Sequence, residues 1–322
     1  KTIHLEITSK CQASCPMCAR NLQGGIDNPF MTLDEITLDK FKSWFDPTFI
    51  QQLDRLYMCG NLGDPVIAKD TLLIFNYCRD INPNINLSMN TNGSARGNTF
   101  WEQLAKLNVA VHFGIDGLQD THSIYRIGTN FDTIIKNATT FIKHGGYAIW
   151  DMLVFDHNKH QVGGCQHMAD QMGFKQFHSK NTSRFKGESL VVLDKTGKAL
   201  YNIYGTDRSK TLTQKLSEQN LEEPKITINC KVQKEKSLYV SATGNITGGN
   251  VLGSILRSTQ SQANEGGEIQ LAKPPNGTLS GGVTIDAYQN RLRIFEQGGS
   301  ARGVYVDLSD CPTGVAGEIT YK

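Results

Sequence analysis

Three cysteines lie within eight positions near the start of the chain, Cys11, Cys15 and Cys18 in the stretch CQASCPMC. A closed metal site takes four protein ligands, and no fourth cysteine follows nearby in the sequence. The spacing suits a loop around a four-iron, four-sulfur cluster, in which thiolates hold three irons and one iron stays open. Two other interpretations remain: a zinc ion held together with His4 or water, and an electron-transfer cluster that needs a fourth cysteine.

The rest of the composition is that of an ordinary globular chain. It has 322 residues, of which 39% are hydrophobic and 20% charged, and its net charge of +2 gives no sign of nucleic-acid or membrane-surface binding. No apolar run is long enough to span a membrane, and no signal segment opens the chain, which begins at Lys1. The other five cysteines are scattered and are expected to be small buried residues in a reducing cytoplasm: Cys59, Cys78, Cys165, Cys230 and Cys311.

The cysteines follow the first of six expected strands, and helical segments alternate with these strands up to about residue 185. Short turns rich in Gly, Asn and Asp separate them, which predicts a parallel sheet with right-handed crossovers that curls into a full or partial barrel. In segment 31–45, Thr32 and Glu35 have the spacing of a capping box and predict a helix start. The expected strands are 2–8, 53–60, 84–93, 109–117, 147–155 and 174–180, and the expected helices are 31–45, 68–80, 100–108, 131–145 and 161–173.

The sequence predicts three parts, 1–185, 186–245 and 246–322. The middle part is polar and includes a hairpin at 189–204 and a strand and turn at 237–246. The last part is rich in Gly, Asn, Ser and Thr, and its period-two segments predict a small antiparallel β module. Its strands are expected at 267–273, 282–287, 291–297 and 303–309.

The cysteine motif resembles that of the radical S-adenosylmethionine (SAM) superfamily, and further motifs match that family in order. GNLGDP at 60–65 is similar to the family's element after strand two, where backbone and acidic groups meet the SAM amino group. NTNG at 90–93 and FGIDG at 113–117 resemble the ends of strands three and four, and IYRIGTNFDTII resembles the stretch that follows. The resemblance implies cofactor-binding roles for Gly60, Gly63, Asp64, Asn92, Gly114, Asp116, Arg126 and Asn158.

The resemblance implies a partial (β/α)6 barrel of the α/β class and two cofactors, a [4Fe-4S] cluster on Cys11, Cys15 and Cys18, and SAM. It implies reductive cleavage of SAM and hydrogen abstraction from a peptide or small molecule, with an external electron donor. Arg126 is expected to face the SAM carboxylate or a substrate, and no catalytic residue is otherwise assigned. The segments VFDHNKHQ and FHSKNTSRF resemble the peptide- and small-molecule-modifying branch called SPASM/Twitch-like.

Plainer interpretations of these residues stay open. Asp64, Asn92 and Asp116 are also common turn residues, and His157 and His160 are expected to be solvated more often than not. Cys230 stands where the first ligand of an auxiliary cluster is expected in the SPASM/Twitch-like branch, but its partners do not follow in the sequence. We therefore expect no complete auxiliary site unless Cys311 or another chain contributes.

The last part of the chain resembles a different group of proteins. SATGNITGGN and the segment after it are similar to tailed-phage fibre proteins, so a fused or recombined gene is one explanation. The main hypothesis is a radical SAM enzyme of the cytoplasm, including that of a phage-infected bacterium. In this hypothesis the chain forms a homotrimer through its last part. The alternative is a virion structural protein with a vestigial barrel.

Overall fold

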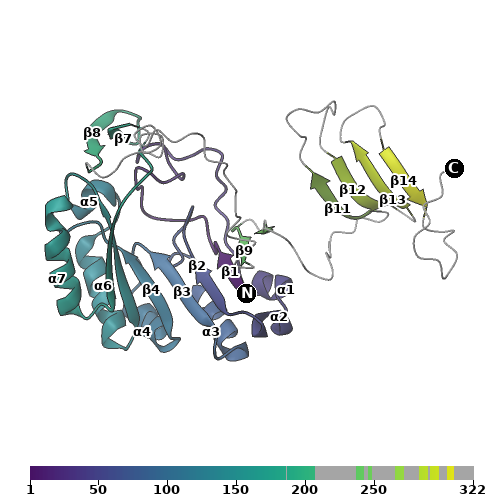
Figure 1. Cartoon of the computed structure of the whole chain (residues 1–322), viewed down its shortest axis with the longest axis horizontal. Coiled ribbons are helices and arrows are strands. Elements are labelled where there is room, and N and C mark those ends of the chain that lie inside the picture. The colour runs from purple at the N-terminus through teal and green to yellow at the C-terminus, as the bar shows by residue number, and fades with distance from the viewer. Residues whose placement is uncertain are drawn as a thin grey trace, which may run out of the picture. The chain divides into compact units, whose positions relative to one another are not determined.

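The computed structural model describes the chain at 1–185, 187–206, 237–242, 246–248, 265–271, 283–288, 291–296 and 303–307. The chain divides into two compact units, Lys1–Asn250 and Val251–Lys322 (Figure 1). The boundaries predicted from the sequence, near residue 185 and between 245 and 246, stay predictions.

The first unit is built on one sheet whose strand order is β10-β9-β1-β2-β3-β4-β5-β6. Strands β9 and β1 to β6 are parallel, and β10 runs antiparallel to β9. Among the described strands the sheet ends at β10 and β6, so the predicted partial (β/α)6 barrel is confirmed and is not closed. The strands are β1 (Thr2–Leu5), β2 (Arg55–Met58), β3 (Asn86–Thr91), β4 (Val109–Gly114), β5 (Tyr147–Val154), β6 (Gln176–Asn181), β9 (Ser237–Val240) and β10 (Ile246–Gly248).

Helices cover one face of this sheet (Figure 1). In β4, Val109, Val111 and Phe113 are buried, whereas the residues between them are less so, because successive side chains point to opposite faces of a strand. Phe113 packs against Trp101 of α4 and Phe141 of α6. The helices are α1 (Leu38–Trp44), α2 (Pro47–Gln51), α3 (Thr71–Ile81), α4 (Asn98–Lys106), α5 (His122–Tyr125), α6 (Phe131–Lys143) and α7 (Val162–Met172), with the short 3₁₀ helix η1 (Lys159–Gln161) before α7.

The predicted helix over 31–45 is wrong in its first half. Helix α1 begins at Leu38, and its N-cap is Thr37, whose hydroxyl accepts a hydrogen bond from Lys40 N at 3.2 Å. The preceding residues are not helical because Ile36 is fully buried and its N–H bonds to Ile7 O at 2.8 Å. Glu35 forms a β-bridge with Thr8 instead of closing a capping box.

The part after β6 forms a hairpin of β7 (Ser189–Leu193) and β8 (Ala199–Tyr204), as the sequence predicts. Val192 and Ile203 of this hairpin pack with Tyr125, Phe155 and Phe185 in a small buried cluster separate from the main core. Strand β9 also forms the predicted hairpin, with β10. It pairs in addition with β1, which the sequence did not indicate.

The second unit contains a four-stranded antiparallel sheet in the order β11-β12-β13-β14, which confirms the predicted antiparallel module. Its strands lie close to the four predicted segments: β11 (Glu265–Leu271), β12 (Val283–Tyr288), β13 (Arg291–Glu296) and β14 (Gly303–Asp307). Across both units, none of the described helices has the length and apolar character needed to cross a membrane.

Candidate functional site

The loop after β1 brings Cys11, Cys15 and Cys18 to one cavity of about 450 Å³ at the carboxyl ends of the parallel strands. All three are free thiols. The loop turns tightly between the last two, because Cys18 N donates to Cys15 O at 2.9 Å. The cavity is therefore lined by three sulfur atoms from one short segment, as the sequence predicts for a cluster loop.

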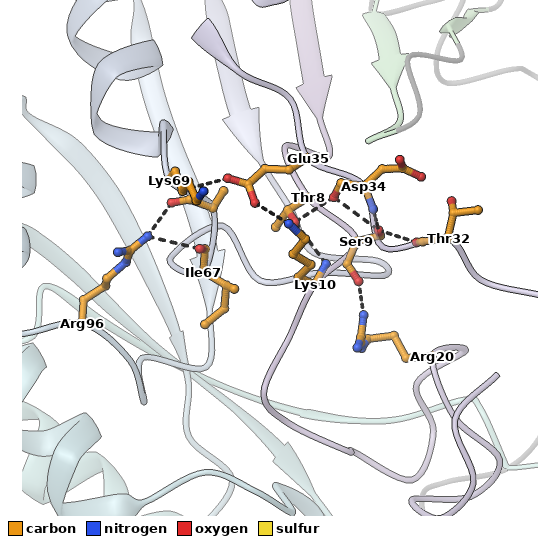
Figure 2. A network of polar contacts seen from close by, with 11 residues as sticks. Thr8, Ser9, Lys10, Arg20, Thr32, Asp34, Glu35, Ile67, Lys69 and Arg96 are labelled. Atoms are coloured by element: carbon orange, nitrogen blue, oxygen red, sulfur yellow. Dashed lines mark hydrogen bonds and ion pairs between the residues drawn. The ribbon is translucent and has the colours of Figure 1, made fainter. Parts of the chain in front are cut away.

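The start of this loop is tied to the segment before α1 (Figure 2). The hydroxyl of Ser9 donates to Thr32 O at 2.6 Å and accepts from Asp34 N at 2.7 Å, and the hydroxyl of Thr8 donates to Asp34 O at 2.9 Å. The guanidinium of Arg20, from the far side of the loop, donates to Ser9 O. Thr32 therefore anchors the cysteine loop through its backbone rather than capping a helix.

Glu35 continues this network toward Lys69 (Figure 2). One of its carboxylate oxygens pairs with Lys10 Nζ at 2.9 Å, and the other accepts from Lys69 N at 2.6 Å. Arg96 in turn donates to Ile67 O at 3.1 Å. Glu35 thus connects the residue before Cys11 to the loop after β2, which forms another wall of the cavity.

The thiols of Cys11 and Cys15 lie in surroundings that disfavour their thiolates. Burial, together with the negative charge of Asp64, raises the pKa of Cys11 to about 12. Burial also raises the pKa of Cys15, although the nearby Arg126 opposes the shift. Buried thiolates need a positive group beside them, and a bound metal centre deprotonates its cysteine ligands outright. Three half-buried sulfur donors on one cavity therefore fit a [4Fe-4S] cluster with one open iron.

The loop after β2 is shaped by Gly60 and Gly63. A Cβ at Gly60 would lie 1.5 Å from Gly63 O, and a Cβ at Gly63 would lie 1.9 Å from Thr8 O, so neither position has room for a side chain. This close approach brings the GNLGDP backbone against the segment that follows β1, where Asp64 N donates to Lys10 O at 2.9 Å. Both glycines line the cavity through their backbones.

The carboxylate of Asp64 is buried, and it accepts hydrogen bonds from the loop after β2, to which it belongs, and from the end of β3. Oδ1 accepts from Thr91 Oγ1 at 2.8 Å and from Val66 N at 3.1 Å, and Oδ2 accepts from Asn92 N at 2.7 Å. Burial raises the pKa of Asp64, and these bonds oppose the rise. Asp64 therefore joins the ends of β2 and β3 while it also lines the cavity.

Asn92 lies directly beside the cysteine loop. Its Nδ2 is 3.6 Å from the sulfur of Cys11, and its Oδ1 accepts from Gln12 Nε2 at 2.7 Å and from Ser94 N at 2.9 Å. An N–H donor near a sulfur ligand is one of the groups that tune an iron–sulfur cluster. The structure therefore brings Asn92 to the sulfur of Cys11 as well as to the cavity.

Arg126 and Asp116 form a buried ion pair at the end of β4. Arg126 Nε donates to Asp116 Oδ2 at 2.6 Å, and Asp116 Oδ1 accepts from Leu153 N at 2.6 Å. Burial alone would lower the pKa of Arg126, but the charges of Asp116 and Cys15 raise it overall. A Cβ at Gly114 would lie 2.6 Å from an Arg126 nitrogen, so the absence of a side chain there makes room for the guanidinium.

The structure does not bring Asn158 to the cavity. Its side chain is buried, its Oδ1 accepts from Phe155 N at 2.7 Å, and its Nδ2 donates to Asp116 O and Leu153 O at 3.2 and 2.9 Å. These bonds shape the turn after β5 that supports Asp116. His157 stacks on Phe155, and burial lowers its pKa.

Sequence reasoning missed several residues that line the cavity. Cys59 follows β2 and was expected to be only a small buried residue, yet it faces the cavity near Asn90, whose Nδ2 is 3.7 Å from its sulfur. The period-two pattern of the strands could have indicated these positions, since it separates cavity-facing from helix-facing side chains. Other missed residues include His112, Asp151, Lys180 and Arg184. Cys230 and Cys311, considered for an auxiliary cluster, lie outside the described residues.

Comparison with known proteins agrees with this geometry. Residues 5–160, just under half of the chain, match the model of the radical SAM superfamily. Enzymes of that superfamily use SAM and a [4Fe-4S] cluster, which fits the sulfur donors of this cavity. None of the curated proteins matches the chain.

Solved structures share the fold at low sequence identity. The structure titled SuiB, from Streptococcus suis, superposes with a TM-score of 0.51 at 13% identity, over 76% of this chain and 59% of that one. SuiB bound to the precursor peptide SuiA covers 56% of this chain and 39% of its own, at 15% identity and a TM-score of 0.46. The structure of anSMEcpe with bound AdoMet matches 56% of this chain and 49% of its own, at 16% identity and a TM-score of 0.46. This chain therefore spans about two fifths to three fifths of the length of these proteins.

Proposed function

We propose that this chain is an enzyme that cleaves SAM reductively and uses the resulting radical to abstract hydrogen from a peptide or small molecule. The observation that carries the proposal is that three cysteines and the guanidinium of Arg126 line one cavity, with the buried Asp116 holding that guanidinium in place. The sulfurs offer three ligands to a cluster that needs a further, external ligand. The guanidinium beside them offers a fixed positive charge to an anionic group.

In this proposal Cys11, Cys15 and Cys18 would hold the cluster through three of its irons, and the open iron would take SAM as its external ligand. A bound cluster would supply the electron for reductive cleavage of SAM. Asp116 keeps Arg126 charged and fixed in orientation beside Cys15, where it neutralises negative charge that the thiolates bring into the cavity. Asp64 holds Asn92 in place at Cys11.

The substrate class follows from the size and lining of the cavity. Lys180 and Arg184 line it together with Asp151, so polar and charged groups of a substrate find partners there. A peptide segment is the substrate we favour, and the bound peptide of the SuiB structure shows that this fold accommodates one in that protein. Assignment to the SPASM/Twitch-like branch and reduction by an external donor belong to the same proposal.

The test is anaerobic reconstitution of the full chain with iron and sulfide, followed by dithionite and SAM. We expect 5′-deoxyadenosine from the wild-type chain and none above background from Cys15→Ala. Cys165→Ala, which removes a buried cysteine of the main core, is the matched control and is expected to keep the activity. Failure of the reconstituted wild-type chain to form 5′-deoxyadenosine would refute the enzyme proposal.

We further propose that the second unit is an assembly module, which is the role its resemblance to phage fibres suggests. The observation that favours it is the separate four-stranded antiparallel sheet after Asn250. Light scattering of the full chain is expected to give a trimer, and a chain ending at Asn250 a monomer. If both chains are monomeric, the assembly role is refuted while the SAM reaction is unaffected.

A further inference from the structure

Three side chains from adjacent parallel strands converge on the inner face of the sheet. They are His112 of β4, Asp151 of β5 and His178 of β6. In the strand register Asp151 lies beside both Gly114 and His178, and His112 lies two residues before Gly114 and so on the same face. His112 Nδ1 is 2.9 Å from Asp151 Oδ2, and His178 Nδ1 is 2.9 Å from Asp151 Oδ1.

We propose that His112, Asp151 and His178 bind a divalent first-row transition metal ion, a site distinct from the cysteine cluster. Two imidazoles and a carboxylate are a ligand set that suits zinc and its neighbours in the first row. One potential ligand atom from each residue lies within 4.8 Å of the others. Ligands at about 2.1 Å from one ion are separated by about 3 Å, which is close to the two nitrogen–oxygen distances found here.

The donor atoms of the cluster suit a cation. Both carboxylate oxygens of Asp151 face an imidazole nitrogen at 2.9 Å, so the ion would meet one carboxylate between two nitrogen ligands. A ring nitrogen binds a metal only through its lone pair, so each imidazole would carry its proton on the other nitrogen.

The position of the three side chains indicates what a bound ion would do. His112 and Asp151 line the same cavity as the three cysteines, and their side chains are 25% and 21% exposed. Three protein ligands leave at least one coordination position open, as in sites where a metal binds substrate. An ion here would hold an oxygen or nitrogen of the substrate inside the cavity, and thereby fix its position for the reaction.

Lys180 is the neighbour that separates this proposal from its main rival. It lies two residues after His178 on the same face of β6, and its charge contributes to the lowered pKa of Asp151. If the cluster binds a cation, the charge of Lys180 opposes that binding, and removing the charge strengthens metal binding. If the cluster and Lys180 together bind an anionic group instead, removing the charge weakens binding of that group, and the wild-type chain binds no metal.

The experiment measures zinc on the reconstituted full chain. The protein is incubated with Zn²⁺ and freed of loosely bound ion, and zinc and iron are counted in the same sample, so that a loss of cluster iron reveals zinc at the cysteines. Zn²⁺ affinity is then measured for the wild-type chain and for Asp151→Asn, His178→Gln and Lys180→Gln. His144→Gln, which changes an exposed histidine near Glu102, is the matched control.

We expect about one zinc ion per chain in the wild type and in His144→Gln. Asp151→Asn and His178→Gln are each expected to weaken binding at least about 100-fold, because even loss of an outer-shell partner costs about 10- to 100-fold. Lys180→Gln is expected to strengthen it. Tryptophan fluorescence shows that the variants are folded. Zinc content equal in the wild type and both ligand variants, or no zinc in the wild type, would overturn the proposal, and neither result depends on SAM cleavage.

Discussion

His122 is a buried histidine whose neutral ring holds the backbone of Asp116. Lowering the pH is expected to destabilise the first unit, because the unfolded chain gains a proton at His122 that the folded chain does not. Its Nδ1 accepts from Asp116 N at 3.1 Å, and its Nε2 lies 2.9 Å from Thr129 Oγ1. Nδ1 is therefore unprotonated, and the ring fixes the backbone of the residue that holds Arg126. Burial, aided by the charge of Arg126, lowers the pKa of His122 from 6.5 to about 3.

The size of the effect follows from this difference. Because the folded pKa is depressed, the stabilisation is complete above the unfolded pKa near 6.5 and is lost progressively as the pH falls toward 3. Between pH 7 and pH 5 the unfolded chain takes up a proton at His122 and the folded chain does not. The free energy of unfolding should fall by about 2 kcal/mol over that interval from this residue alone.

Urea unfolding followed by tryptophan fluorescence measures this directly, since the three tryptophans of the chain, Trp44, Trp101 and Trp150, all belong to the first unit. His122→Gln should be less stable than the wild type at pH 7 but lose about 2 kcal/mol less on going to pH 5. His144→Gln should keep the wild-type slope. Equal slopes for the wild type and His122→Gln would refute the reasoning, because other groups would then account for the acid sensitivity.

Two further predictions concern the wall of the cavity and the inner face of the sheet. Gly63→Ala places a Cβ against Thr8 O and should lower the free energy of unfolding in urea by about 1–3 kcal/mol or more. Gly163→Ala is the control, because a Cβ there meets nothing within 4 Å, and it should be neutral or stabilising. Similar costs for both variants would contradict the steric argument. Burial raises the pKa of Glu6, so its charge destabilises the fold once the pH exceeds the unfolded value of about 4.5. Glu6→Gln should therefore raise the melting temperature at pH 7 and lose this advantage toward pH 4, and a lower melting temperature at pH 7 would show that the charge is compensated.

Local patterns in the sequence were sufficient for much of the fold. Strand β4 and helix α6 lie within the predicted segments because their period of two or 3.6 is decided by residues close together in the chain. The start of α1 was missed because Thr32 and Glu35 have the spacing of a capping box but are used by tertiary contacts, Thr32 with Ser9 after β1 and Glu35 with Lys69 after β2. Spacing alone does not distinguish these two uses.

The candidate site shows the same limit. Cys11, Cys15 and Cys18 were identifiable because one short loop supplies them all. The cluster of His112, Asp151 and His178 was not, because its members are spread over three strands and only the register brings them together. Asn158 was assigned to the cofactor from its place after β5, and its amide proves to be bonded to backbone atoms.

The pairing of β9 with β1 bears on how the protein is synthesised. Thr2 pairs with Arg55 on one side and with Ser237 on the other, so the strand that leads into the cysteine loop is completed by one of the last segments of the first unit. While the chain leaves the ribosome, β1 remains an edge strand with unpaired backbone groups, which is a hazard for aggregation. Such long-range pairing also slows folding. We therefore expect insertion of iron and sulfur to follow the synthesis of β9 rather than that of the cysteine loop alone.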